Sequence, residues 1–260
     1  VVRAYLHGVF PSPPVQPVVA FYSAARAAAT SSLTDGAGLR PVYSLRTLTR
    51  ALSFTAQLGP AYGLERALYE GFSMAFMTQL SAAAQDELGS IMTDTLLASR
   101  KLHQLTKPPA HPGDGHVLFE HFWLSTGPNK PVVNPKFILT RTVRMHLKNL
   151  ARGILAGKYP ILLQGPTSAG KTSMVEYLAA ATGHDFVRIN NHEHTDLQEY
   201  IGSYVAGPSG SLVFQEGLLV QAARSGSWLV LDELNLAPSE VLEALNRLLD
   251  DNRELFIPET

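Results

Sequence analysis

The sequence lacks cysteine altogether among its 260 residues, which excludes both a disulfide framework and a thiolate metal site. No apolar run approaches the roughly 18 residues that a membrane-spanning helix needs, so we expect no membrane partner. The formal net charge is −1, and the chain therefore lacks the basic excess typical of proteins that bind nucleic acid. We predict no direct binding to nucleic acid. What remains is a chain with 45% hydrophobic and 17% charged residues, a balance typical of a folded protein.

The pattern of apolar residues divides the chain into three parts. Residues 1–105 carry apolar side chains at helical spacing, as in the steps of four from Leu64 to Leu80, and predict a small all-α bundle. Residues 106–135 are rich in proline and glycine and predict a linker with one short strand at 116–124. Residues 136–260 alternate between strand-like and helix-like runs, which predicts an α/β domain with a parallel sheet.

A loop bracketed by glycines organises the third part. Residues Gly165–Thr172 match the pattern G-x-x-x-x-G-K-[ST], and the apolar run Ile161–Leu163 predicts the buried strand that precedes such a loop. Its two glycines allow a tight turn in which successive backbone N–H groups face one anion, and the following helix adds the positive end of its dipole. We therefore predict a nucleotide phosphate site that consists of Gly165, Pro166, Thr167, Ser168, Ala169, Gly170, Lys171, Thr172 and Ser173.

Two side chains of this loop have separate predicted roles. The ammonium group of Lys171 is long enough to reach the β- and γ-phosphates of ATP. The hydroxyl group of Thr172 is an oxygen ligand for Mg²⁺. The loop thus predicts ATP and Mg²⁺ as the cofactors of the chain.

Two carboxylates follow a second apolar run. Residues Trp228–Leu231 predict a fully buried central strand, and Asp232 and Glu233 come directly after it, where open α/β sheets bind ligands. We predict that Asp232 holds Mg²⁺, through water or directly, together with Thr172, and that Glu233 is the catalytic base that orients the attacking water. A strand that simply ends in acidic surface residues is the alternative, but the phosphate loop upstream favours the functional interpretation.

Other polar residues give weaker signals. Asn190 ends a neighbouring predicted strand, where it either contacts the attacking water or the γ-phosphate or merely caps the strand end. His111, His116 and His121 are spaced by five; a metal site is conceivable there, but no helical or finger-like pattern of ligands supports it. The stretch His192–His194 lacks the H-E-x-x-H spacing that places two histidines on one helix face, so we interpret it as a polar loop.

Longer stretches of the sequence resemble one protein family. Around the phosphate loop and the carboxylate pair, the sequence resembles the AAA+ ATPases of the MoxR and dynein-related type. Within that group it is more similar to the midasin family, whose members carry several AAA+ modules in one polypeptide. The stretches that bear the likeness are Tyr43–Leu52, Ile189–Gly202, Phe214–Leu219, Leu231–Pro238 and Glu243–Leu255.

The resemblance implies an order of domains. An AAA+ module of this family has its large domain first and its helical lid second, whereas here the helical part comes first. Residues 1–105 would then be the lid of one module and residues 136–260 the large P-loop domain of the next, truncated at its end, in a piece of a longer polypeptide. Arg46 matches the sensor-2 arginine of the lid and would serve a nucleotide of the preceding module. The family's sensor-1 residue and arginine finger would follow Thr260, so neither is assigned.

The resemblance also implies a function. Members of the family hydrolyse ATP to release assembly factors from pre-ribosomal particles during maturation and nuclear export of the large ribosomal subunit. The implied partners are ATP, neighbouring AAA+ modules of the same polypeptide, pre-ribosomal particles and assembly factors, and the implied location is the nucleus, in nucleolus and nucleoplasm. A module that binds nucleotide only as a structural part of the ring is the alternative. A bacterial MoxR chaperone is disfavoured because its lid would follow the phosphate loop.

Overall fold

The computed structural model describes residues 1–97, 105, 107–157, 159–207, 210–250, 253–255 and 257. The chain forms two compact units. We call the first the helical unit; it comprises Val1–Gly113, Leu118–Trp123 and Lys148–Gly157. We call the second the α/β unit; it comprises Asp114–Val117, Leu124–Leu147 and Lys158–Thr260. Among the helices that the structure describes, none combines the length and the apolarity that crossing a membrane requires.

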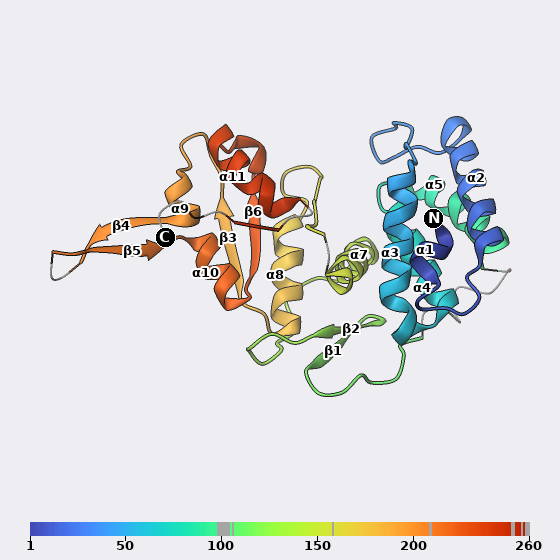
Figure 1. Cartoon of the computed structure of the whole chain (residues 1–260), viewed down its shortest axis with the longest axis horizontal. Coiled ribbons are helices and arrows are strands. Elements are labelled where there is room, and N and C mark those ends of the chain that lie inside the picture. The colour runs from blue at the N-terminus through green and yellow to red at the C-terminus, as the bar shows by residue number, and fades with distance from the viewer. Residues whose placement is uncertain are drawn as a thin grey trace. The chain divides into compact units, whose positions relative to one another are not determined.

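The helical unit contains the helices α1 to α5 (Figure 1). Their bounds are Val2–Leu6 for α1, Val15–Ser31 for α2, Leu45–Tyr62 for α3, Leu64–Phe76 for α4 and Ala82–Thr95 for α5. Ser44 caps the start of α3, because its side chain accepts a hydrogen bond from the backbone N–H of Thr47.

Aromatic rings fill the core of the helical unit. Phe21 and Phe72 are both fully buried, and their rings meet edge to face with centroids 5.3 Å apart. Phe72 stacks on Phe76, one turn further along α4, at 5.7 Å. The apolar stripe of the sequence is therefore core packing, although α4 ends at Phe76, and Leu80 instead pairs with Asp35 in an isolated bridge.

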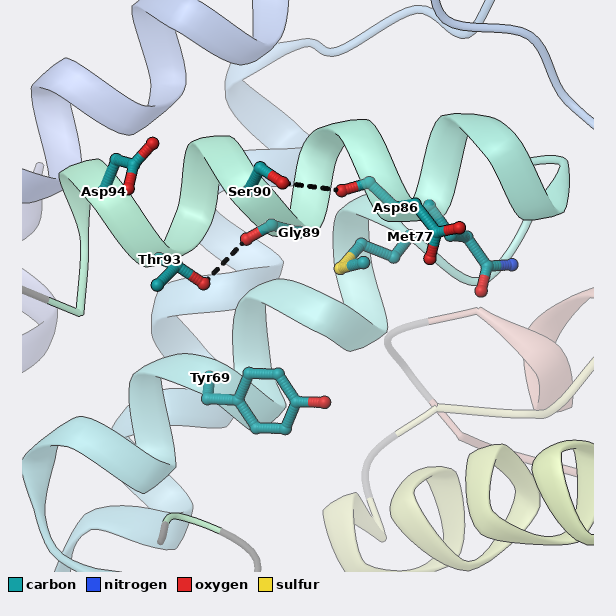
Figure 2. Close-up of a pocket in the computed structure, with 8 residues that line it drawn as sticks. Tyr69, Met77, Asp86, Gly89, Ser90, Thr93 and Asp94 are labelled. Atoms are coloured by element: carbon teal, nitrogen blue, oxygen red, sulfur yellow. Dashed lines mark hydrogen bonds between the residues drawn. The ribbon is translucent and has the colours of Figure 1, made fainter. Parts of the chain in front are cut away.

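An open pocket of about 620 Å³ lies on the helical unit against α4 and α5 (Figure 2). Two of its hydroxyl groups bond to carbonyl oxygens of their own helix: Ser90 donates to Asp86 at 3.2 Å, and Thr93 to Gly89 at 2.9 Å. None of the predicted site residues lines the pocket. Its lining consists of Tyr69, Met77, Gln85, Asp86, Gly89, Ser90, Thr93 and Asp94.

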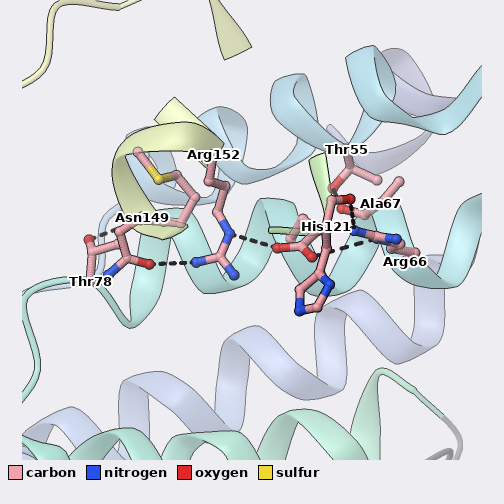
Figure 3. A network of polar contacts seen from close by, with 9 residues as sticks. Thr55, Arg66, Ala67, Thr78, His121, Asn149 and Arg152 are labelled. Carbon is pink, nitrogen blue, oxygen red and sulfur yellow. Dashed lines mark hydrogen bonds and ion pairs between the residues drawn. The ribbon is translucent and has the colours of Figure 1, made fainter. Parts of the chain in front are cut away.

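A buried ion cluster joins α4 to α7, which spans Arg141–Ala156 (Figure 3). Glu70 is fully buried and accepts a hydrogen bond from Nε of Arg152 at 2.6 Å, while Nε of Arg66 lies 3.6 Å from its other oxygen. Both arginine side chains are only 5% exposed. Arg66 also donates to the carbonyl oxygens of Lys107 and His121, so the cluster fastens the loop before β2 as well.

This cluster changes the division of the chain that the sequence suggested. Residues 136–156 were predicted to belong wholly to the second domain, but the contacts group Lys148–Gly157 with the helical unit. Leu155 and Ala156, at the end of α7, pack against Phe54 and Leu58 there. The helix begins at Arg141, and the hydroxyl of Thr140 caps it by accepting a hydrogen bond from the N–H of Val143.

The proline-rich segment contains a small sheet. The single strand expected at 116–124 is instead two paired strands, β1 (His116–Phe119) and β2 (Phe122–Ser125). The turn between them places Glu120 at a φ of 54°, which breaks the run that the sequence presents as continuous.

The α/β unit alternates helices and strands, as the sequence predicted. Strands β3 (Phe186–Asn190) and β6 (Trp228–Asp232) pair in parallel, with Asn190 beside Asp232 at their carboxyl ends. Strands β4 (Gly202–Ala206) and β5 (Leu212–Glu216) form an antiparallel hairpin (Figure 1). The helices are α8 (Lys171–Thr182), α9 (Leu197–Ile201), α10 (Leu218–Ser225) and α11 (Ser239–Leu249), with a 3₁₀ turn at Leu234–Leu236.

Two strand predictions fail in this unit. Residues Ile161–Leu163 form no strand, and the side chains of Ile161 and Leu162 are 41% and 86% exposed instead of buried. Among the described strands, β6 pairs only with β3, and none pairs with this run. For the same reason β6 is half-buried along its length and not the fully buried central strand that Trp228–Leu231 predicted.

Helix ends in this unit follow local chemistry. Gly183 ends α8 in the left-handed conformation. The capping box of α9 consists of Asp196 and Glu199. The hydroxyl of Thr195 accepts a hydrogen bond from the N–H of His192 at 2.8 Å and is therefore engaged in the preceding loop.

Candidate functional site

The loop between residue 164 and α8 has a left-handed backbone where the motif requires glycine. Gly170 caps α8 with φ 78° and ψ 18°, a conformation that other residues adopt at a cost of roughly 1–2 kcal/mol. Ser168 also has a positive φ, 64°. Gly165 shows no such demand, because an added Cβ would meet only the Cδ atom of Lys171, at 4.0 Å. The conformational need for glycine is therefore greatest at Gly170.

Lys171 folds back over this loop. Its Nζ atom donates to the carbonyl oxygens of Gly165 at 3.0 Å and of Pro166 at 2.9 Å. An ammonium group has three donors, so these two bonds hold the charge within the loop and leave donor capacity for an anion. This is the position from which the sequence predicts contact with phosphate groups.

The start of α8 meets the end of β6. The hydroxyl of Thr172 donates to Oδ2 of Asp232 at 2.9 Å, which brings together the two predicted magnesium ligands. A hydroxyl and a carboxylate are hard oxygen ligands of the kind that Mg²⁺ prefers, so the residues fit this metal. Thr172 and Asp232 would hold it.

Asp232 is ionised at neutral pH. Burial by itself raises the pKa of this carboxyl, but the Thr172 hydrogen bond and the positive charge of Arg188 outweigh it, and the pKa lies below its ordinary value. The Oδ1 atom accepts a further bond, from the backbone N–H of Glu233 at 3.1 Å. The carboxylate is thus held in one orientation by donors on both of its oxygens.

Glu233 has a strained backbone and an exposed side chain. Its φ of 50° and ψ of 39° lie in the left-handed region, directly before the 3₁₀ turn. Such strain is concentrated at functional sites, where it sets the direction of a side chain. The position is consistent with a base that acts on a bound water.

The sequence reasoning missed two residues beside Asp232. Arg188 forms an ion pair with it, Nη2 to Oδ2, at 2.6 Å. Asn191, which is 1% exposed, donates from both its backbone N–H and its Nδ2 to the carbonyl oxygen of Asp232, while its Oδ1 accepts from the hydroxyl of Tyr200 at 2.6 Å. The only sequence signal for Arg188 is its spacing of two from Asn190, which places both on one face of β3.

The remaining candidate residues lie in several parts of the chain. Asn190 is exposed and pairs in register with Asp232, which leaves both of its predicted roles open. Arg46 lies exposed in the first turn of α3, in the helical unit, and its assignment as a sensor-2 residue stays a prediction. His111 accepts from the N–H of Gly113 through Nδ1. Within the described part of the chain, no three His, Asp or Glu side chains are grouped to bind a metal.

Comparison with known families identifies both parts of the chain. Residues 1–99 match the Midasin AAA lid domain, and residues 160–260 match the AAA domain of the dynein-related subfamily. The bundle and the phosphate-loop domain therefore belong to the AAA+ fold class, a parallel α/β P-loop domain preceded by a helical lid.

Individual relatives agree with this assignment. The chain is 50% identical to Midasin of Dictyostelium discoideum over its whole length and 40% identical to Midasin of Giardia intestinalis over 90% of it, and it spans 5% of each of those proteins. It is also 34% identical, over 39% of its length and 38% of the relative, to the denitrification regulatory protein NirQ of Pseudomonas aeruginosa. With a Midasin AAA lid followed by a dynein-related AAA domain, the chain belongs to the midasin family of AAA+ proteins.

Proposed function

We propose that the chain contains an ATP-binding and ATP-hydrolysing AAA+ site that uses Mg²⁺. The observation that supports this most directly is the 2.9 Å hydrogen bond between Thr172 and Asp232, which joins the phosphate loop to the acidic strand end. The strained backbone of Glu233 next to it supplies a candidate base. The same loop and carboxylate pair recur in enzymes that hydrolyse nucleoside triphosphates.

The residues of the site divide between phosphate binding, metal binding and catalysis. The backbone N–H groups of Gly165–Thr172 and the ammonium of Lys171 bind the phosphates, while Thr172 and Asp232 hold the metal. When bound, Mg²⁺ neutralises charge that develops on the phosphate oxygens. The carboxylate of Glu233 orients a water molecule toward the γ-phosphate and accepts its proton.

The test of hydrolysis is Glu233→Gln in the whole protein. The side chain keeps its size but loses its basicity, so we expect ATP turnover at this site to fall at least 100-fold, while ATP affinity stays within about twofold. Both are measured on the same preparation, by phosphate release and by binding of a fluorescent ATP analogue.

The second candidate is a site that binds nucleotide without hydrolysing it and acts as a structural part of the ring. The exposed side chain of Glu233 is the observation that favours this second candidate. It predicts equal turnover in wild type and Glu233→Gln, so the experiment above decides between the two. The carboxylate itself favours hydrolysis.

The wider role follows from family likeness. We propose that the whole protein acts on pre-ribosomal particles, that it releases assembly factors during maturation and export of the large ribosomal subunit, and that it is located in the nucleus. Its other partners would be the neighbouring AAA+ modules of its own polypeptide, with Arg46 serving the nucleotide of the preceding one. Imaging of the tagged whole protein tests the nuclear location. The variant Arg46→Ala tests whether this arginine serves the nucleotide of the preceding module.

A further inference from the structure

Arg188 occupies an unusual position for a cation. It lies inside β3, paired in register with Val230, and period-two alternation puts it on the same face of the two strands as Asp232. Its Nη2 atom is 2.6 Å from Oδ2 of Asp232. That is the same oxygen to which the hydroxyl of Thr172 donates, at 2.9 Å. One carboxylate oxygen thus receives both a hydroxyl proton and a guanidinium group.

The guanidinium contact conflicts with metal binding by Oδ2. The hydroxyl of Thr172 donates its proton to Oδ2 and keeps its own lone pairs for a metal, but Oδ2 has two lone pairs, which the hydroxyl proton and the guanidinium together occupy. A divalent ion and a guanidinium on one oxygen would also repel each other. The arginine side chain is 49% exposed, so it has room to leave.

We propose that Arg188 is a substitute cation for Mg²⁺: it neutralises Asp232 when the metal is absent and must release Oδ2 before the metal binds. This inference rests on the proposed nucleotide site. It assigns Arg188 as a positioning residue that sets how strongly nucleotide binding depends on magnesium. Arg188 neutralises the carboxylate of Asp232 and so reduces its repulsion of metal-free nucleotide. Arg188 also competes with Mg²⁺ for this carboxylate.

Loss of Arg188 should weaken the binding of metal-free ADP and strengthen the binding of Mg²⁺. These opposite effects distinguish the proposed role from a merely structural one. In Arg188→Gln, the unpaired carboxylate repels metal-free nucleotide, so ADP affinity in EDTA falls. The same carboxylate no longer has a competitor, so the Mg²⁺ concentration that gives half-maximal ADP binding also falls. An arginine that only supports the fold would, when lost, weaken binding under both conditions.

The experiment measures binding of a fluorescent ADP analogue to this chain, in EDTA and across a magnesium series. We expect Arg188→Gln to lower the affinity in EDTA and the magnesium midpoint by about three- to tenfold each, the range for a partly exposed charge-assisted pair. Arg188→Lys keeps the positive charge but lacks the planar guanidinium, so both of its values should lie between those of wild type and Arg188→Gln. An unchanged or higher magnesium midpoint overturns the proposal.

Two controls make the outcome specific. Arg224→Gln removes an ion pair of the same kind, to Glu216 at 2.5 Å, away from the phosphate loop, and should leave both values unchanged. Lys171→Ala reports on the nucleotide site itself. Wild-type protein that binds no ADP even at high magnesium overturns the proposed function, and this inference with it, whereas binding with an unmoved midpoint overturns the role of Arg188 alone.

Discussion

At the scale of single residues, the site is organised around the carboxylate of Asp232. Its two oxygens accept from Thr172, Arg188 and the N–H of Glu233, and its backbone carbonyl accepts twice from Asn191. The sequence motif predicted the first of these partners. It was silent on Arg188 and Asn191, because their contacts depend on the register of β3 beside β6, which no short-range pattern specifies.

The ionised state of Asp232 predicts a pH dependence. Its folded pKa lies below the ordinary value of 3.8, so the stabilisation it provides is fully present above that value and is lost as pH falls through the lower, folded pKa. We expect wild type to be more stable than Asp232→Asn at pH 7 and the difference to shrink below about pH 4. Urea midpoints across the pH range measure this, and a gap that stays constant would show that the charge contributes nothing.

The buried ion cluster predicts a large effect of one substitution. Glu70→Gln removes the only negative charge of the trio and leaves Arg66 and Arg152 buried without a counter-charge, so we expect the helical unit to lose about 3–5 kcal/mol of unfolding free energy. Asp94→Asn, at an exposed position of α5, is the control and should change stability by no more than about 0.5 kcal/mol. Denaturant melts compare the two, and equal small effects would contradict the account.

At the scale of elements, predictions succeeded where the signal was local. Ser44 caps the start of α3 and Gly183 caps the end of α8 through neighbouring side-chain and backbone groups, which a short window of sequence contains. The strand at Ile161–Leu163 failed because a strand needs partners, and none of the described strands pairs with this run. The start of α9 shows the limit of such rules, since the adjacent residues Thr195 and Asp196 are both good caps and the structure uses Asp196.

The start of α8 allows a matched pair of glycine variants. Gly170→Ala places a side chain at φ 78°, so we expect a loss of about 1 kcal/mol of stability together with weaker nucleotide binding. Gly165→Ala meets only the Lys171 side chain, at 4.0 Å, and should leave stability nearly unchanged. Thermal unfolding of both variants tests this, and equal losses would argue against a special role for the left-handed turn.

At the scale of the whole molecule, the order of a lid followed by a phosphate-loop domain was predictable, and the family matches agree with it. The end of α7 was not predictable. Its grouping with the helical unit depends on Arg152 meeting Glu70, 82 residues earlier in the chain, and nothing in the local sequence marks that contact. Long-range polar contacts of this kind become visible only in the folded structure.

The central claim is that Gly165–Thr172 is a working phosphate site, and it is tested most directly by binding of a fluorescent ATP analogue with Mg²⁺. We predict saturable binding by the wild-type chain and at least a tenfold loss of affinity in Lys171→Ala, because the ammonium is the main positive charge of the loop. Lys136→Ala, an exposed lysine of the same unit, should bind as wild type does. Equal binding by wild type and Lys171→Ala, or none by either, would contradict the account.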